Sequence, residues 1–238
     1  MTELEVHMFP CLQDNYGFLI HDAAAELTAV IDTPDVPAIE RALAEQGWNL
    51  THILNTHHHF DHAGGNLELK QKTGCTVVGP RADASRIPGI DIQLGDGDVF
   101  RFGEHQATVY GTPGHTRGHI VYHFENAGLA FVGDTLFAMG CGRLFEGTPE
   151  QMWSSLQKIM CWPDDTQLYC AHEYTQANAR FALSVEPDNE ALQARSQEVD
   201  RLRAQGKPTV PTTLGLEKAT NPFLRPSSQG LQSVLGLA

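Results

Sequence analysis

The chain has 238 residues, 41% of them hydrophobic and 19% charged, which is ordinary for a globular protein of this length. The count of 16 Lys and Arg against 29 Asp and Glu gives a formal net charge of −13, which argues against nucleic acid as a partner. The sequence contains no apolar run of membrane-spanning length, and its 5 scattered cysteines favour reduced thiols in a cytoplasm. A cytoplasmic protein that binds no membrane is therefore expected.

Strands and helices are expected to alternate through the first three quarters of the chain. Short apolar runs bounded by turn residues are typical of strands, and they cover 4–9, 16–21, 27–32, 52–54, 75–79, 105–111, 119–124, 129–133 and 167–170. Helical patterns cover 37–46, followed by Gly47 as terminator, and 65–74. This alternation predicts a mixed α/β domain.

The most distinct helical pattern covers 148–160. Thr148 and Gln151 have the spacing of a capping box, and Pro149 occupies the favoured first helical position. The character changes beyond residue 172, where two helices are expected, over 174–185 and 189–204, before a Pro/Thr-rich stretch and a short tail. The sequence thus predicts one domain over 1–172 and a small, mostly helical domain over 173–238.

The segment THHHFDH, residues 56–62, concentrates chemistry that a structural role does not require. His57 and His59 are two residues apart, so on an extended segment they point the same way and can bind one metal ion. Asp61 and His62 follow where the chain turns toward a helix, so they can serve a second ion. His58 points away from its neighbours and is predicted not to be a ligand. The segment predicts a dinuclear centre.

Further ligands are available at other strand ends. His115, Asp134 and His172 each follow a predicted strand, where a sheet presents its loops to a common crevice. Each of them alone would more often be a solvated histidine or a turn-forming aspartate, so the cluster carries the inference. His119 is a candidate for supporting a ligand. The cysteines are expected to be small buried hydrophobes.

These residues resemble the metallo-β-lactamase superfamily, whose hallmark is H-x-H-x-D-H. In this chain the motif and the ligands that follow it are His57, His59, Asp61, His62, His115, Asp134 and His172. The resemblance covers most of the chain. It implies an αββα sandwich, in which two mixed sheets pack face to face with helices outside and the metals at one edge.

Four further stretches look like the glyoxalase II family, the hydroxyacylglutathione hydrolases. They are LQDNY (12–16), GCGRLFEGT (140–148), AHEYT (171–175) and NPFLR (221–225). The resemblance implies that the first metal is held by His57, His59 and His115. It implies a second metal on Asp61, His62 and His172, with Asp134 bridging the two. By the same resemblance, substrate contacts fall on Arg143, Phe145 and Tyr174. The domain over 1–172 is then the metal-binding catalytic domain, and the domain over 173–238 contributes to the substrate site.

The ligand types suit zinc, with iron or manganese as alternatives. Two such ions would acidify a bridging water to hydroxide, and that hydroxide would attack the thioester carbonyl. The resemblance implies hydrolysis of S-D-lactoylglutathione to glutathione and D-lactate in methylglyoxal detoxification, with Asp61 and Asp134 in catalytic positions. A monomer or weak oligomer is expected.

Two alternatives remain open from the sequence. One is a related metallo-hydrolase that acts on another thioester or a lactone. It is kept because the residues after Arg225 include no Lys or Arg, whereas family members typically end in a basic segment. The other is a mono-iron glutathione-persulfide dioxygenase on the same scaffold. The full second set of ligands and the GCGRLFEGT stretch favour the hydrolase.

Overall fold

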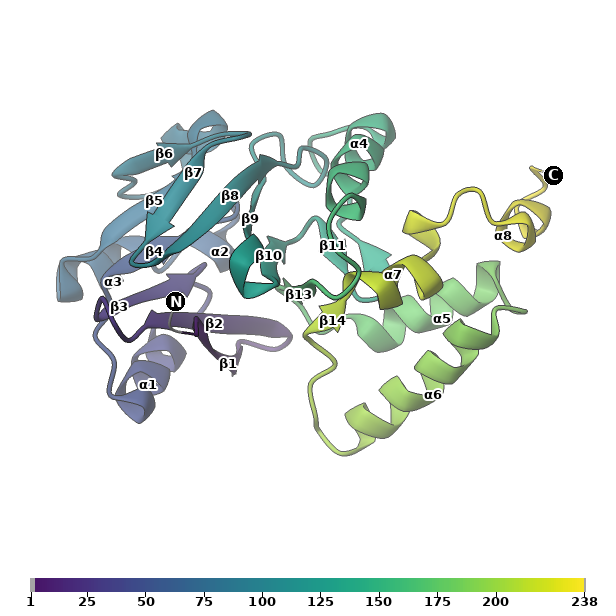
Figure 1. Ribbon diagram of the computed structural model, residues 1–238, viewed down its shortest axis with the longest axis horizontal. Coiled ribbons are helices and arrows are strands. Elements are labelled where there is room, and N and C mark those ends of the chain that lie inside the picture. Colours follow the sequence, from purple (N-terminus) through teal and green to yellow (C-terminus); the bar gives the residue numbers. More distant parts are fainter. Residues whose placement is uncertain (1–2, 238) are drawn as a thin grey trace.

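The computed structural model describes residues 3–237 and contains two six-stranded sheets (Figure 1). The first sheet has the strand order β1 (Glu5–Cys11), β2 (Asn15–Asp22), β3 (Leu27–Ile31), β4 (His52–Leu54), β5 (Thr76–Pro80) and β6 (Ile92–Leu94). The second has the order β14 (Thr212–Thr213), β13 (Gln167–Cys170), β10 (Leu129–Gly133), β9 (Ile120–Phe124), β8 (His105–Gly111) and β7 (Val99–Phe102). Parallel pairs run from β3 to β6 and between β10 and β13; the other pairs are antiparallel.

The two faces of the first sheet are buried against different layers. In β2, Phe18 and Ile20 belong to the core shared with the second sheet, whereas Leu19 between them belongs to the core under the helices. Successive side chains of a strand point to opposite faces, so a strand buried on both sides reads as a continuous apolar run. This explains why 16–21 and 27–32 show no polar alternation.

Helices cover the outer face of each sheet. On the first sheet lie α1 (Val36–Gln46) and α3 (Asn66–Thr73), which bury Ile39 and Leu69 there. On the second sheet lies α4 (Pro149–Met160), which buries apolar residues of one face, Met152, Leu156 and Ile159, in the shared core. The layers therefore follow the order helix, sheet, sheet, helix, and the predicted αββα sandwich is confirmed.

The helices that follow β13 in sequence lie to one side of the sheets in Figure 1. They are α5 (Thr175–Val185), α6 (Glu190–Ala204), α7 (Leu214–Thr220) and α8 (Gln229–Val234). A small core between α5 and α6 contains Met139, Ala179, Ala182, Leu192 and Val199. Because β14 from this region pairs with β13, the last quarter of the chain also extends the second sheet. The domain boundary at 172 stays a prediction.

The predicted strands and helices are all present to within two residues at their ends. The sequence missed the short strands β6, β7, β11 (Leu136–Phe137), β12 (Gly140–Cys141) and β14, and it missed α7 and α8. Strands of two to four residues are too short to show a periodicity. Also unpredicted are the 3₁₀ turns η1 (Arg81–Arg86), η2 (Glu125–Ala127) and η3 (Pro222–Leu224).

The expectation about cysteines is only partly correct. Cys11, Cys75 and Cys170 are buried, but Cys161 is exposed and Cys141 is half-buried. Cys161 is the residue that ends α4, where the chain turns toward solvent before β13. Within residues 3–237, none of the helices is long and apolar enough to cross a membrane.

Candidate metal centre

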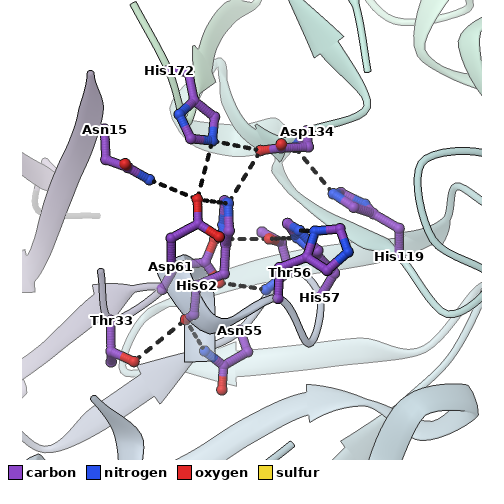
Figure 2. Close-up of polar contacts among 12 residues, drawn as sticks. Asn15, Thr33, Asn55, Thr56, His57, Asp61, His62, His119, Asp134 and His172 are labelled. Carbon is purple, nitrogen blue, oxygen red and sulfur yellow. Dashed lines mark hydrogen bonds and ion pairs between the residues drawn. The ribbon is translucent and has the colours of Figure 1, made fainter. Parts of the chain in front are cut away.

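The seven predicted ligands meet at one edge of the two sheets. Figure 2 shows five of them, His57, Asp61, His62, Asp134 and His172. His57 follows β4, and His115, Asp134 and His172 follow β8, β10 and β13 of the second sheet. The short helix α2 (Phe60–Ala63) begins after His59 and carries Asp61 and His62, and the centroid of the His62 ring lies 4.0 Å from that of the His57 ring. Two sets of possible ligand atoms lie within 4.8 Å of one another: those of His57, His59 and His115, and those of Asp61, His62 and His172.

The first group consists of three histidine nitrogens. His57 Nε2 lies 3.0 Å from His59 Nδ1, and His115 Nε2 lies 3.1 Å from the same atom. Two ligands bound to one tetrahedral ion at about 2.0–2.1 Å are roughly 3.3 Å apart, so these nitrogens have the spacing that a shared ion requires. This group is compatible with a metal site made of three neutral imidazoles.

The second group contains a carboxylate. Asp61 Oδ2 lies 3.5 Å from His62 Nε2 and 3.6 Å from His172 Nε2. Figure 2 shows these three side chains pointing toward one another, with Asn15 donating to Asp61 Oδ2 at 3.2 Å. The spacing again fits ligands of a common ion rather than a compact hydrogen-bonded cluster.

Asp134 lies between the two groups. Its Oδ1 is 3.4 Å from the Nε2 atoms of both His62 and His172, and its Oδ2 is 3.4 Å from His115 Nε2. His62 Nε2 and Asp134 Oδ1 are buried and lack a hydrogen-bond partner among the described residues. Because unpaired buried polar atoms are costly, these two atoms call for a cation between them. The donor set therefore fits a dinuclear metal site.

Acceptors behind the rings fix the orientation of four of the histidines. Each acceptor lies beside the Nδ1 atom of a histidine, and the Nε2 atom of that histidine faces the centre. The acceptors are Thr56 Oγ1 for His57 (3.0 Å), Asp32 Oδ2 for His62 (2.8 Å), the Arg143 carbonyl for His115 (2.8 Å) and Asp14 Oδ1 for His172 (3.0 Å). Such contacts set the tautomer of a metal-binding imidazole. His59 differs, since its Nδ1 faces the other ligands.

Sequence reasoning missed Asp14 and Asp32 as site residues. Asp32 ends the predicted strand 27–32, and Asp14 lies inside the LQDNY stretch, so a strand-end aspartate and a family motif were the available signals. The contact of Asp14 with His172 spans 158 positions, which local patterns cannot reveal.

His119 supports the site without joining either ligand group. Its Nε2 accepts a hydrogen bond from the backbone N–H of Asp134 at 3.1 Å, and its ring stacks on His57 with 4.8 Å between centroids. Thr112 and Thr135 contact its other nitrogen at 3.0 and 3.1 Å. It therefore contacts two of the candidate ligands, and its supporting role stays a prediction.

The electrostatics differ between the two groups. Burial lowers the pKa of His57, His59 and His115, which keeps these imidazoles in the neutral form that metal binding needs. Burial would also lower the pKa of His62, but the carboxylates of Asp134 and Asp32 raise it well above the usual range. The second group thus favours positive charge at its centre, whether a proton or a metal ion provides it.

A cleft of about 550 Å³ opens over both groups. Its lining residues are His59, Asp61, His115, Asp134, Phe137, Cys141, Arg143, Phe145, His172, Tyr174, Ala177 and Asn178. The three residues predicted to contact substrate are therefore beside the candidate metal ligands. Tyr174 stacks on His172 with 4.8 Å between ring centroids, and the Arg143 guanidinium lies 5.5 Å from the centroid of Phe145.

His58 is turned away from both ligand groups. Its Nδ1 lies 3.1 Å from the buried carboxylate of Asp83, and Arg86 donates to its Nε2 at 3.0 Å. Both ring nitrogens of His58 therefore have partners outside the two candidate ligand groups, and its exclusion from the ligands stays a prediction.

Comparisons with known proteins agree with this geometry over the whole chain. The model of the metallo-beta-lactamase superfamily matches residues 20–172, and that of the hydroxyacylglutathione hydrolase C-terminus matches residues 173–238. The hydroxyacylglutathione hydrolase of Maricaulis maris is 58% identical, with 100% of this chain and 93% of that protein covered. The one from Methylococcus capsulatus is 53% identical, with 98% and 91% covered. The crystal structure of ETHE1 from Myxococcus xanthus is 26% identical, with a TM-score of 0.70 and 98% and 90% covered.

Proposed function

The chain belongs to the hydroxyacylglutathione hydrolase family of the metallo-β-lactamase superfamily, and from this premise we propose that it hydrolyses S-D-lactoylglutathione to glutathione and D-lactate. The observation that carries the proposal is the position of Asp134, whose two carboxylate oxygens face different ligand groups. Both groups line a cleft with room for a small substrate.

We assign the first ion to His57, His59 and His115, the second to Asp61, His62 and His172, and the bridge to Asp134. Zinc suits these imidazole and carboxylate donors, with iron and manganese as alternatives. When bound, two such ions supply an acidified water as nucleophile and positive charge for the oxyanion that develops at the thioester carbonyl. Asp61 and Asp134 remain anionic, because neighbouring histidines outweigh burial and lower the pKa of both carboxyl groups.

Among the described residues that line the cleft, the side chain to consider as a competing nucleophile is a cysteine. Cys141 is the cysteine that lines it, and burial raises the pKa of this thiol to about 12, so the thiolate is scarce near neutral pH. This supports attack by water rather than a covalent acyl-enzyme.

Substrate contacts are assigned to the rim of the cleft. Arg143 provides a guanidinium for a carboxylate of glutathione, and Phe145 an apolar surface over the first ligand group. Burial and the nearby carboxylates of Asp14, Asp134 and Asp61 raise the pKa of Tyr174 to about 12. Its phenol therefore stays protonated and can donate a hydrogen bond to the substrate.

A mono-iron dioxygenase explains the second ligand group less well. That group adds Asp61, His62 and His172 to a complete set of three histidines, and the orphaned His62 Nε2 belongs to it. Metal count and oxygen consumption separate the two possibilities.

The test is a hydrolysis panel on metal-analysed protein, with S-D-lactoylglutathione, a coenzyme A thioester and a lactone side by side. We expect the glutathione thioester to be the best substrate. Arg143→Ala should raise its KM and largely preserve kcat, because a distal contact binds ground state and transition state alike. Activity on the lactone without turnover of glutathione thioesters would overturn the proposal.

A further inference from the structure

A polar network beside the metal centre joins three loops that are far apart in sequence. Asp83 and Arg86 come from η1, His58 comes from the metal-binding segment, and Glu146 comes from the segment between β12 and α4. The backbone N–H of Arg117 donates to Glu146 Oε2 at 2.8 Å and brings in the loop that carries His115.

Arg86 is the centre of this network. Its guanidinium donates to both carboxylate oxygens of Glu146, with Nη2 3.0 Å from Oε2, and it also donates to Asp83. In a third contact, Arg86 Nη1 donates to His58 Nε2 at 3.0 Å. Asp83 is only 2% exposed and also accepts from His58 Nδ1. The planar guanidinium suits such a set of contacts, because its donors match the two oxygens of a carboxylate.

His58, Asp83 and Glu146 also have the spacing of a metal-ligand group. Arg86 already provides a cation that contacts all three, so we assign no metal ion to them. The hydrogen bonds from Arg86 outweigh partial burial and lower the pKa of Glu146 to about 2. The pair is therefore charged over the whole working pH range.

Glu146 anchors the loop 142–147, which forms one wall of the cleft. This loop carries Arg143 and Phe145, and the Phe145 ring lies 5.6 Å from the ring of His59 and 5.2 Å from that of His115. Two backbone bonds tie it to the loop of His115, from Phe145 N–H to the His115 carbonyl (3.3 Å) and from Gly147 N–H to the Gly114 carbonyl (3.0 Å). Phe145 itself is 60% exposed, so packing contributes little to its position.

We propose that Arg86 is a positioning residue that acts through Glu146, holding the loop 142–147 so that Phe145 and Arg143 face the cleft. This inference rests on the proposed function for its kinetic effect. It also gives His58 a part, since its ring contacts Asp83 and Arg86 and so connects segment 56–62 to the network.

Removing the guanidinium should affect substrate binding more than chemistry. Arg86→Gln should raise KM for S-D-lactoylglutathione about threefold to tenfold, the range of one lost contact, with kcat and metal content close to wild type. Arg86→Lys keeps the charge but cannot make all the contacts, so its KM should lie between the two. The matched control is Arg81→Gln, because Arg81 lies in the same 3₁₀ turn but pairs with Asp98.

The experiment measures KM, kcat and metal content for wild type, Arg86→Gln, Arg86→Lys, Glu146→Gln, the Arg86→Gln/Glu146→Gln double variant and Arg81→Gln. The double variant should be no worse than either single change, because both break the same contact. Amide hydrogen exchange supplies a readout without substrate: the amides of Phe145 and Gly147 should exchange faster in Arg86→Gln than in Arg81→Gln.

The outcomes separate this inference from the proposed function. If wild type does not hydrolyse glutathione thioesters, the proposed function fails, and the exchange measurement still decides the role of Arg86. Unchanged loop exchange in Arg86→Gln overturns the inference. Additive effects on KM in the double variant would also overturn it. The same holds for a loss of metal in Arg86→Gln that accounts for the change in activity.

Discussion

Asp134 has the most demanding position of the candidate ligands, because its two oxygens must reach two groups at once. The backbone holds it at the end of β10, where its N–H donates to His119 and fixes the start of the side chain. In the proposed assignment, a single carboxylate placed this way would set the separation of the two ions.

We therefore expect Asp134→Ala to lose metal and activity together. Elemental analysis should fall below two metals per chain, and kcat should fall at least ~100-fold, which corresponds to roughly 3 kcal/mol of transition-state stabilisation. The control is His58→Ala, which should retain both metals because its ring nitrogens contact Asp83 and Arg86. Equal metal loss in the two variants would show that the ligand assignment is wrong.

Helix α4 is the element that most directly supports the loop 142–147. It begins at Pro149, and Thr148 is its N-cap residue. The Thr148 side chain accepts a hydrogen bond from the Gln151 N–H, and the Gln151 side chain accepts one from the Thr148 N–H. This capping box satisfies donors that the first turn of a helix otherwise leaves unpaired. The capping box could be predicted from the four residues 148–151, because capping is a local interaction.

Thr148→Ala should lower the free energy of unfolding by about 1 kcal/mol, the usual cost of a lost N-cap. Denaturant unfolding monitored by circular dichroism measures this change. Ser154→Ala, an exposed position in the same helix, is the control and should be nearly neutral. A loss in Ser154→Ala as large as that in Thr148→Ala would mean that the cap contributes nothing specific.

At the scale of the whole molecule, one carboxylate joins several parts of the C-terminal region. Glu186, at the end of α5, accepts hydrogen bonds from Asn189 at the start of α6, from Arg225 and from Ser228 at the start of α8. Burial alone would raise the pKa of Glu186, but these hydrogen bonds and the charge of Arg225 lower it to about 2. The carboxylate form therefore stabilises the folded state.

The resulting pH dependence has a defined direction. Glu186 contributes its full stabilisation above the unfolded pKa of 4.5, and this is lost as the pH falls through about 2, because the unfolded state binds the proton more readily. The contribution is on the order of 3 kcal/mol. Glu186→Gln should lose stability less steeply than wild type between pH 4.5 and 2, as measured by unfolding at each pH. Metal loss affects both proteins and cancels in the difference; parallel slopes would contradict the prediction.

The sequence alone determined those features that depend on neighbours in the chain. The spacing of His57 and His59 divides the motif into two ligand groups, because side chains alternate along an extended segment. The cap at Thr148, the terminator Gly47 and the apolar strands follow from equally local preferences. Together with the family resemblance, these were sufficient for the fold and for a dinuclear centre.

Only the tertiary structure decided which distant groups orient those ligands. Asp14 reaches His172 and Asp32 reaches His62 because strands separated in sequence are adjacent at one sheet edge. The pairing of Arg86 with Glu146 likewise depends on contact between two segments that are 60 residues apart in sequence. The sequence around an aspartate or arginine in a loop does not show whether its side chain is solvated or bound to another side chain. Its partner is set by the packing of the two sheets, which no short stretch of sequence encodes.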